Sequence, residues 1–141
     1  MRKPSGLLIS IALLLIVEAG FAQNFIGMHK DEIKQTMKET QKSLKLNTST
    51  VNKHYNYLKY EDPINEITVF YFLSDQDECI QIRKIYDYSN INDVVAQLND
   101  DYKEDGFNKW YYKDKGKKYD VILKEDDWFF TVTVKKEEKK D

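Results

Sequence analysis

Few side chains in this sequence belong to the types that perform nucleophilic or metal chemistry. Its two histidines are His29 and His54, and its one cysteine is Cys79. A catalytic triad or a histidine-based metal site has almost nothing to draw on from such a set. No serine lies in a Gly-x-Ser-x-Gly motif, and no glycine-rich phosphate-binding loop occurs. The sequence therefore predicts no catalytic residue, no metal ligand and no cofactor.

Cys79 is the one nucleophile to consider. It follows Asp77 and Glu78, whose negative charge raises a thiol pKa and so lowers the fraction of reactive thiolate. Gln81, two residues further along the expected strand, is not a base. We interpret Cys79 as a buried structural thiol, and a redox role or an intermolecular disulfide are the alternatives.

Two kinds of charge cluster stand out. The acidic segments 75–78 and 125–127 are predicted turns, and carboxylates clustered in a loop can bind a hard cation such as calcium. Neither segment has EF-hand spacing, so we interpret both as ordinary turns, with cation binding as the alternative. Lys30, Lys34, Lys38 and Lys42 form a ridge on an expected helix. We interpret the ridge as a solvated face, and contact with an anionic surface is the alternative.

The candidate binding residues are aromatic. Tyr55, Tyr57, Trp110, Tyr112 and Trp128 all fall on expected strands. In a sheet covered on one side, strand alternation sends some of these rings to the uncovered side. Tyrosine and tryptophan give large contact areas with little rotamer entropy to lose, which suits recognition of a protein or a sugar. The alternative is that these rings pack in the core or are covered by a second copy of the chain.

The elements that position these residues follow the same order twice. Apolar periodicity predicts helices over residues 28–44 and 91–102, the second ended by Gly106 as a C-cap. Strands are predicted over residues 54–60, 67–73, 79–86, 107–112, 118–124 and 128–134. Neither half could bury both of its faces alone. The predicted fold is therefore α+β: two helix-plus-three-stranded-meander units forming one antiparallel sheet, with both helices on one face.

The composition places the chain among ordinary globular proteins. It has 141 residues, of which 41% are hydrophobic and 33% charged, and a formal net charge of -2. That balance excludes the strongly basic surface typical of nucleic-acid binding. The length suits a single domain, which we expect over residues 23–135, with repeat units 25–87 and 88–135. Residues 136–141 are expected to be a charged, disordered tail.

The first 22 residues have the order of a secretory signal peptide. Arg2 and Lys3 precede an apolar run, and Gly20 and Ala22 supply the small side chains that a cleavage site needs. The run is shorter than the roughly 20 residues of a membrane span, although an uncleaved anchor is the alternative. We therefore expect a periplasmic or secreted protein with no membrane span after cleavage.

Residues 26–33 read Ile-Gly-Met-His-Lys-Asp-Glu-Ile. This segment resembles the glycine–methionine helix start of two groups of small secreted bacterial proteins, the β-lactamase-inhibitor-protein modules and the SmpA/OmlA-type outer-membrane lipoproteins. The resemblance implies an exported interaction fold of helix plus antiparallel sheet. It implies no specific partner and no functional residue, because the lipid-bearing cysteine is missing and the second half opens with Tyr88-Ser89-Asn90-Ile91.

Two functions from different classes follow. The first is a non-catalytic, exported binding protein, inhibitor-like in character, whose partner is a protein or carbohydrate of the cell envelope or a second copy of the chain. The alternative is an envelope hydrolase that acts on polysaccharide through paired carboxylates. That chemistry needs two carboxyl groups about 5–10 Å apart over a cleft. Because the acids of this sequence crowd its turns and termini, no such pair is nominated.

Overall fold

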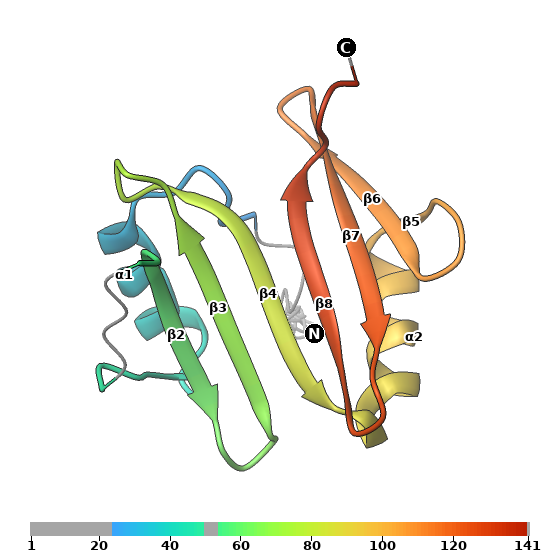
Figure 1. Ribbon diagram of the computed structural model, residues 1–141, viewed down its shortest axis with the longest axis horizontal. Coiled ribbons are helices and arrows are strands. Elements are labelled where there is room, and N and C mark those ends of the chain that lie inside the picture. The colour runs from blue at the N-terminus through green and yellow to red at the C-terminus, as the bar shows by residue number, and fades with distance from the viewer. Residues whose placement is uncertain (1–23, 50–53, 141) are drawn as a thin grey trace, which may run out of the picture.

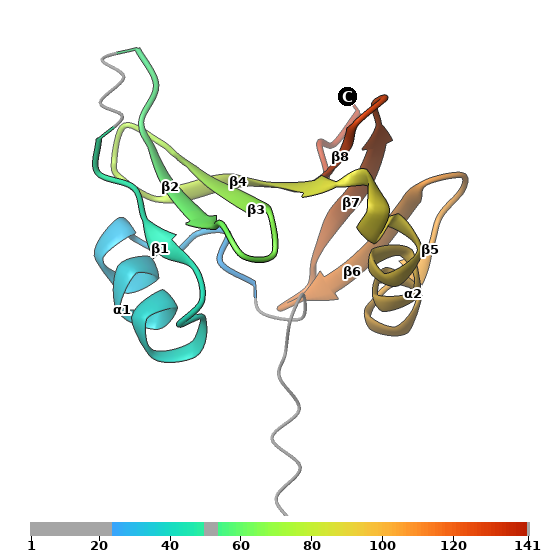
Figure 2. The ribbon, with the colours of Figure 1, turned by 90° about the horizontal axis from the view of Figure 1, so that it is seen from below.

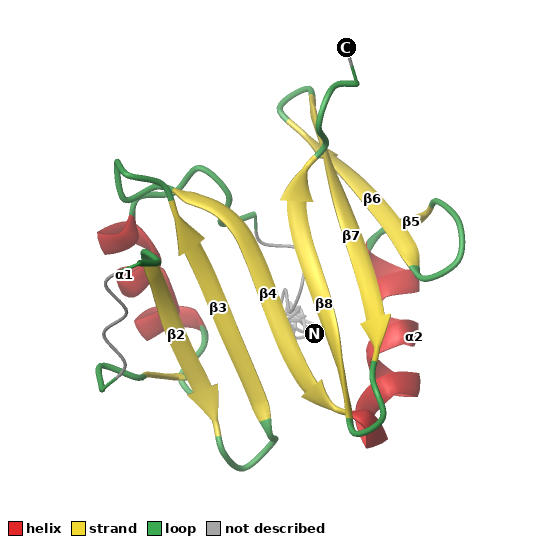
Figure 3. Cartoon of the chain, in the orientation of Figure 1, coloured by secondary structure: helices red, strands yellow, loops and turns green. Residues whose placement is uncertain are grey.

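The computed structural model describes residues 24–49 and 54–140. The predicted signal peptide, residues 1–22, lies outside the described residues. The chain forms one eight-stranded antiparallel sheet with two α-helices (Figures 1 and 3), so the α+β prediction is confirmed at this level. None of the helices in the described part is both long enough and apolar enough to cross a membrane.

The sheet is built from strands in the order β1-β2-β3-β4-β8-β7-β6-β5. The elements along the chain are α1 Lys30–Thr40, β1 Lys45–Leu46, β2 Tyr57–Asp62, β3 Ile67–Leu73, β4 Cys79–Asp87, the 3-10 turn η1 Tyr88–Asn90, α2 Ile91–Asp101, β5 Lys103–Glu104, β6 Lys109–Asp114, β7 Lys117–Glu125 and β8 Phe129–Lys136. The central pair is β4 with β8, in register from Gln81 opposite Lys135 to Asp87 opposite Phe129.

Strand alternation gives the sheet a core face. The buried residues of this face form one hydrophobic cluster with the buried residues of both helices. The helical members are Ile33 and Met37 of α1 and Val94 and Leu98 of α2. Phe130 of β8 is fully buried there and stacks on Tyr86. The helices lie at opposite ends of the strand order, α1 beside β1 and α2 beside β5 (Figure 2). We call the strand positions that alternate with the core positions the open face.

The ends of α2 differ from expectation. Asn90 is its N-cap residue, but the Asn90 side chain makes no capping hydrogen bond. Asp87 performs that role one turn earlier, because its Oδ1 accepts from the backbone N–H of Ser89 at 2.9 Å. The expectation that Gly106 ends the helix is wrong. Tyr102 is the C-cap, and Gly106 lies in the β5–β6 loop with a φ of 106° that favours glycine.

The edges and the C-terminal segment also show more order than expected. The two-residue strands β1 and β5 are additions at the two edges of the six predicted strands. β8 extends to Lys136, and the backbone N–H of Glu137 donates to the carbonyl of Lys118 at 2.9 Å. Strand pairing therefore extends two residues into the segment that the sequence predicts to be a disordered tail.

Candidate binding surface

Three aromatic rings gather on the open face of β2 and β3. The ring centroid of Tyr57 lies 5.4 Å from that of Phe70 and 6.2 Å from that of Phe72. Phe70 and Phe72 stack at 5.8 Å with an interplanar angle of 16°. Residues two apart on a strand share a face, and Tyr57 is paired with Phe72 across the strands. All three rings are half-buried, so part of each is open to solvent. We call these three residues the ring cluster.

Two cations lie over the ring cluster. The Nζ atom of Lys59 is 5.9 Å from the centroid of Phe70, and the guanidinium carbon of Arg83 is 5.6 Å from that of Phe72. Such contacts are worth about 0.5–1 kcal/mol at exposed sites. They hold the positive charges of β2 and β4 at fixed places beside an apolar surface.

The open face is hollowed next to the ring cluster. A groove of about 490 Å³ runs over β4, β8 and β7, and its lining includes Arg83, Ile85, Ile122, Phe129 and Lys135. Arg83 belongs to both the groove and the cation contacts. The ring cluster and the groove therefore form one continuous surface.

This surface carries an excess of positive charge. The pairing registers place seven basic and three acidic residues on the open face of β2–β4 and β6–β8, which are Lys59, Arg83, Lys109, Lys113, Lys118, Lys124 and Lys135 against Glu61, Asp87 and Asp120. Lys59 pairs with Glu61, and Lys109 and Lys118 pair with Asp105. The remaining basic residues, Arg83, Lys113, Lys124 and Lys135, carry the positive excess of this face. An anionic partner would be attracted to this face in particular.

Of the five aromatic residues nominated from sequence, Tyr57 alone lies in the ring cluster. Tyr55 precedes β2 and is 66% exposed, and Trp128 is 82% exposed in the β7–β8 turn. Both are accessible, but neither belongs to the cluster.

Trp110 and Tyr112 lie on the core face. Trp110 is 4% exposed, and its indole N–H donates to Oδ1 of Asn99 at 2.8 Å. Trp110 therefore packs in the core, which is the alternative that the sequence left open for these rings. Tyr112 is half-buried between the rings of Tyr102 and Tyr119, and its hydroxyl donates to Oδ1 of Asn24 at 3.0 Å. Neither ring is available to a partner on the open face.

The sequence analysis did not nominate Phe70, Phe72, Lys59 or Arg83. A signal was present, because Phe70 and Phe72 alternate with Val69, Tyr71 and Leu73 along one strand. Apolar residues on both faces of a strand are typical of cover on both sides. In this strand, Phe70 and Phe72 instead leave an apolar patch on one side.

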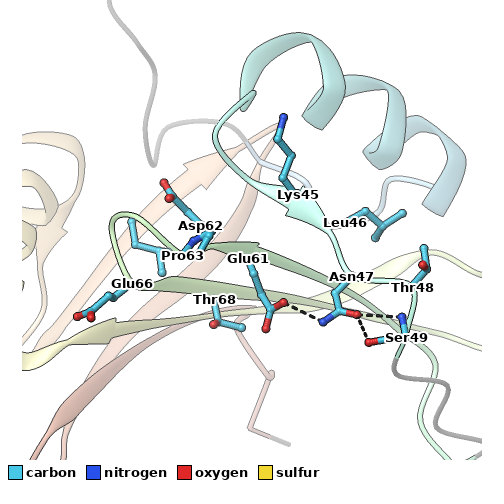
Figure 4. A pocket seen from close by; sticks show the side chains of 11 residues that line it. Lys45, Leu46, Asn47, Thr48, Ser49, Glu61, Asp62, Pro63, Glu66 and Thr68 are labelled. Atoms are coloured by element: carbon cyan, nitrogen blue, oxygen red, sulfur yellow. Dashed lines mark hydrogen bonds between the residues drawn. The ribbon is translucent and has the colours of Figure 1, made fainter.

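A second hollow, of about 630 Å³, lies between β1 and the β2–β3 turn (Figure 4). Hydrogen bonds from Lys59 and Asn47 hold the pKa of the Glu61 carboxyl below its usual value. Hydrogen bonds from Asn65 do the same for the pKa of Asp62. Because both groups are held as carboxylates, this pair lacks the proton donor that carboxylate-based glycoside hydrolysis needs.

The acidic turn between β3 and β4 is tied to α1. Oδ2 of Asp77 pairs with Nζ of Lys30 at 2.7 Å, and its Oδ1 accepts from Nδ2 of Asn56 at 2.7 Å. The ammonium group of Lys30 lowers the pKa of Asp77.

In residues 24–49 and 54–140, no group of three or more His, Cys, Asp and Glu side chains is arranged to hold a metal ion. His29 is the N-cap of α1, where its Nδ1 accepts from the backbone N–H of Asp31.

Cys79 is 1% exposed and unpaired in a disulfide, which confirms the prediction of a buried thiol. Burial raises its pKa to about 12. We expect the folded protein to resist iodoacetamide at about pH 8 and the denatured protein to be alkylated, because the thiolate is the reactive form. Mass spectrometry of the labelled chain measures both. Equal labelling rates in the two states would contradict the burial.

No protein-family model, curated protein or solved structure matches this chain. The functional argument therefore depends on the geometry described above.

Proposed function

We propose that this protein is a non-catalytic binding module that contacts its partner through the open face of the sheet. The observation that carries the proposal is the ring cluster, whose three rings are half-buried and bordered by Lys59 and Arg83. Contiguous apolar surface of this kind is typical of interaction sites. Aromatic and arginine side chains contribute most of the energy at such sites.

The proposed partner is an anionic protein of the cell envelope. The positive excess on the open face favours carboxylates on the partner. Lys59 and Arg83 lie over the rings of Phe70 and Phe72, which leaves less ring face for stacking against a sugar. A carbohydrate and a second copy of this chain are the other two partners to test. The proposal includes export of the mature chain to the periplasm or the exterior and the inhibitor-like character implied by the resemblance.

We also infer that the domain consists of two helix-plus-meander units, residues 25–87 and 88–135, with both helices on the core face. Two observations support this. The strand order is symmetric about the β4–β8 pair, and each half supplies one helix before its three long strands. Buried residues of both helices belong to one cluster with the core-face strand residues. The alternative of a polysaccharide hydrolase gains no support from the Glu61–Asp62 pair.

The test is a double substitution in the ring cluster, Tyr57→Ala with Phe72→Ala. The matched control is Phe107→Ala, because Phe107 is 92% exposed in the β5–β6 loop and lies away from the cluster. Partners captured from an envelope extract by the mature protein are identified and then titrated against each variant. We expect the double substitution to weaken binding at least about tenfold, because central aromatic residues dominate such interfaces.

Circular dichroism shows whether each variant is folded. Equal binding by the double variant and the wild type would contradict the proposal. Equal weakening by Phe107→Ala would show that the contact does not depend on the open face.

A further inference from the structure

A slot beside the C-terminal half of α1 is lined by four lysines. It has a volume of about 430 Å³ and lies between α1 and β1, and Tyr60 of β2 also lines it. Its other lining residues are Lys34, Lys38, Lys42, Lys45, Leu44 and Leu46. The volume falls within the roughly 300–1,000 Å³ of small-molecule sites. The slot shares no residue with the ring cluster or its groove.

The four lysines bring positive charge to the slot. Lys34, Lys38 and Lys42 recur every four residues, which places them on one side of α1 and the turn that follows it. None of the four forms an ion pair with another described residue. Figure 4 shows Lys45 extending from β1 away from Glu61 and Asn47. Like charges this close repel one another, so an anion in the slot would stabilise the arrangement.

The lining of the slot also includes a hydrogen-bond donor. Tyr60 is 4% exposed and lines this slot, yet its hydroxyl has no hydrogen-bond partner among the described residues. Among the described residues, Oδ1 of Asp120 is the one fully buried side-chain oxygen or nitrogen atom that lacks a hydrogen-bond partner. The Tyr60 hydroxyl is therefore not fully buried. A buried polar group normally has a partner. The Tyr60 hydroxyl is therefore free to donate to a ligand oxygen in the slot.

The apolar part of the lining sets the second requirement for a ligand. Leu44 and Leu46 are half-buried side chains that pack against the core cluster and also line the slot. The alkyl stems of the lysines extend the same apolar wall. An inorganic anion would satisfy the ammonium groups and leave this wall in water. A ligand with both an anionic group and an alkyl chain satisfies both.

We propose that the slot binds a single-chain anionic amphiphile of the fatty-acid class. Its carboxylate lies among the ammonium groups of the four lysines and accepts a hydrogen bond from the hydroxyl of Tyr60. Its alkyl chain lies against Leu44 and Leu46. The ligand is a monomer from solution. This site is independent of the proposed binding function on the open face, so each can fail without the other.

The test is calorimetric titration of the mature protein with decanoate, kept below its micelle-forming concentration. We expect saturable one-site binding that weakens about tenfold in the Lys38→Gln, Lys42→Gln double variant, because charge-assisted hydrogen bonds are lost. Tyr60→Phe is expected to weaken binding about fivefold through the loss of one neutral donor. The matched control is Lys103→Gln, an exposed lysine on β5, which should bind as the wild type does.

Two further ligands make the result decisive. Decyltrimethylammonium has the same chain with the opposite charge and should not bind. Vesicles containing phosphatidylglycerol present anionic headgroups on a membrane surface. Equal affinity of the double lysine variant for decanoate, or equal binding of the cationic amphiphile, would overturn the proposal. Binding to the vesicles without binding to monomeric decanoate would overturn it as well, in favour of a membrane surface. The lysine variants alter exposed side chains, so the test holds even if Tyr60→Phe fails to fold.

Discussion

Replacing Trp110 with alanine is expected to lower the free energy of unfolding by about 3–5 kcal/mol, as large-to-small substitutions of buried aromatic residues do. The ring belongs to the core cluster, and its indole N–H donates to Asn99 of α2. The substitution would leave a cavity between β6 and α2 and would remove the hydrogen bond to the Asn99 amide. Urea denaturation followed by circular dichroism measures the loss.

The second tryptophan supplies the control. Trp128 is largely exposed, and its backbone carbonyl accepts a hydrogen bond from the N–H of Tyr88. Trp128→Ala should therefore change the free energy of unfolding by no more than about 0.5 kcal/mol. Equal destabilisation by the two substitutions would contradict the burial of Trp110 and the exposure of Trp128.

Replacing Lys84 with methionine is expected to raise the free energy of unfolding at neutral pH by about 1–3 kcal/mol, because even a half-buried charge is costly to desolvate. Lys84 lies on the core face of β4, paired with Val69 on one side and Val132 on the other. Burial lowers its pKa to about 8, and the charge of Asp101 offsets that effect in part. Methionine keeps a flexible apolar stem of similar length without the charge.

The pH dependence identifies Lys84 as the source. The pKa of a lysine in the unfolded chain is about 10.4, whereas the pKa of folded Lys84 is about 8. Between these two pH values the unfolded state therefore binds more protons. This group therefore makes the wild type more stable as pH rises through that range. Buried tyrosines such as Tyr71 and Tyr86, whose pKa is raised by burial, are present in both proteins.

The difference between Lys84→Met and the wild type should thus be largest at about pH 7 and shrink towards about pH 9.5. Urea titrations at both values give the comparison. A variant less stable than the wild type at neutral pH would show that the interactions of Lys84 outweigh the cost of its burial.

The sequence predicted the existence of the long strands better than their bounds. The strand Ile67–Leu73 has the expected limits because its β-branched and aromatic run is bounded by turn residues. The first helix ends at Thr40 and not at residue 44, because Leu44 contributes to the core from the loop that follows. The strands β1 and β5 were missed because two residues carry no periodicity, and their pairing depends on the neighbouring strand.

The binding surface was less predictable than the fold. The run Trp110-Tyr111-Tyr112 places aromatic rings on both faces of β6, and composition does not say which face is covered. Only the pairing register assigns Trp110 and Tyr112 to the core and Tyr111 to the opposite side. The cations over the ring cluster come from two strands, β2 and β4, that flank β3. No local pattern in the sequence predicts which side chains of neighbouring strands lie beside these rings.

The middle of the sheet is closed by the strand that is synthesised after all the others described. β8 pairs with β4 on one side and with β7 on the other. Before Phe129–Lys136 leaves the ribosome, the nascent chain presents two long unpaired edges, which are templates for pairing with other chains. A chain truncated just before residue 129 would keep both edges unpaired and would therefore be prone to aggregate. The eight residues of β8 remove that risk by pairing with β4 and β7.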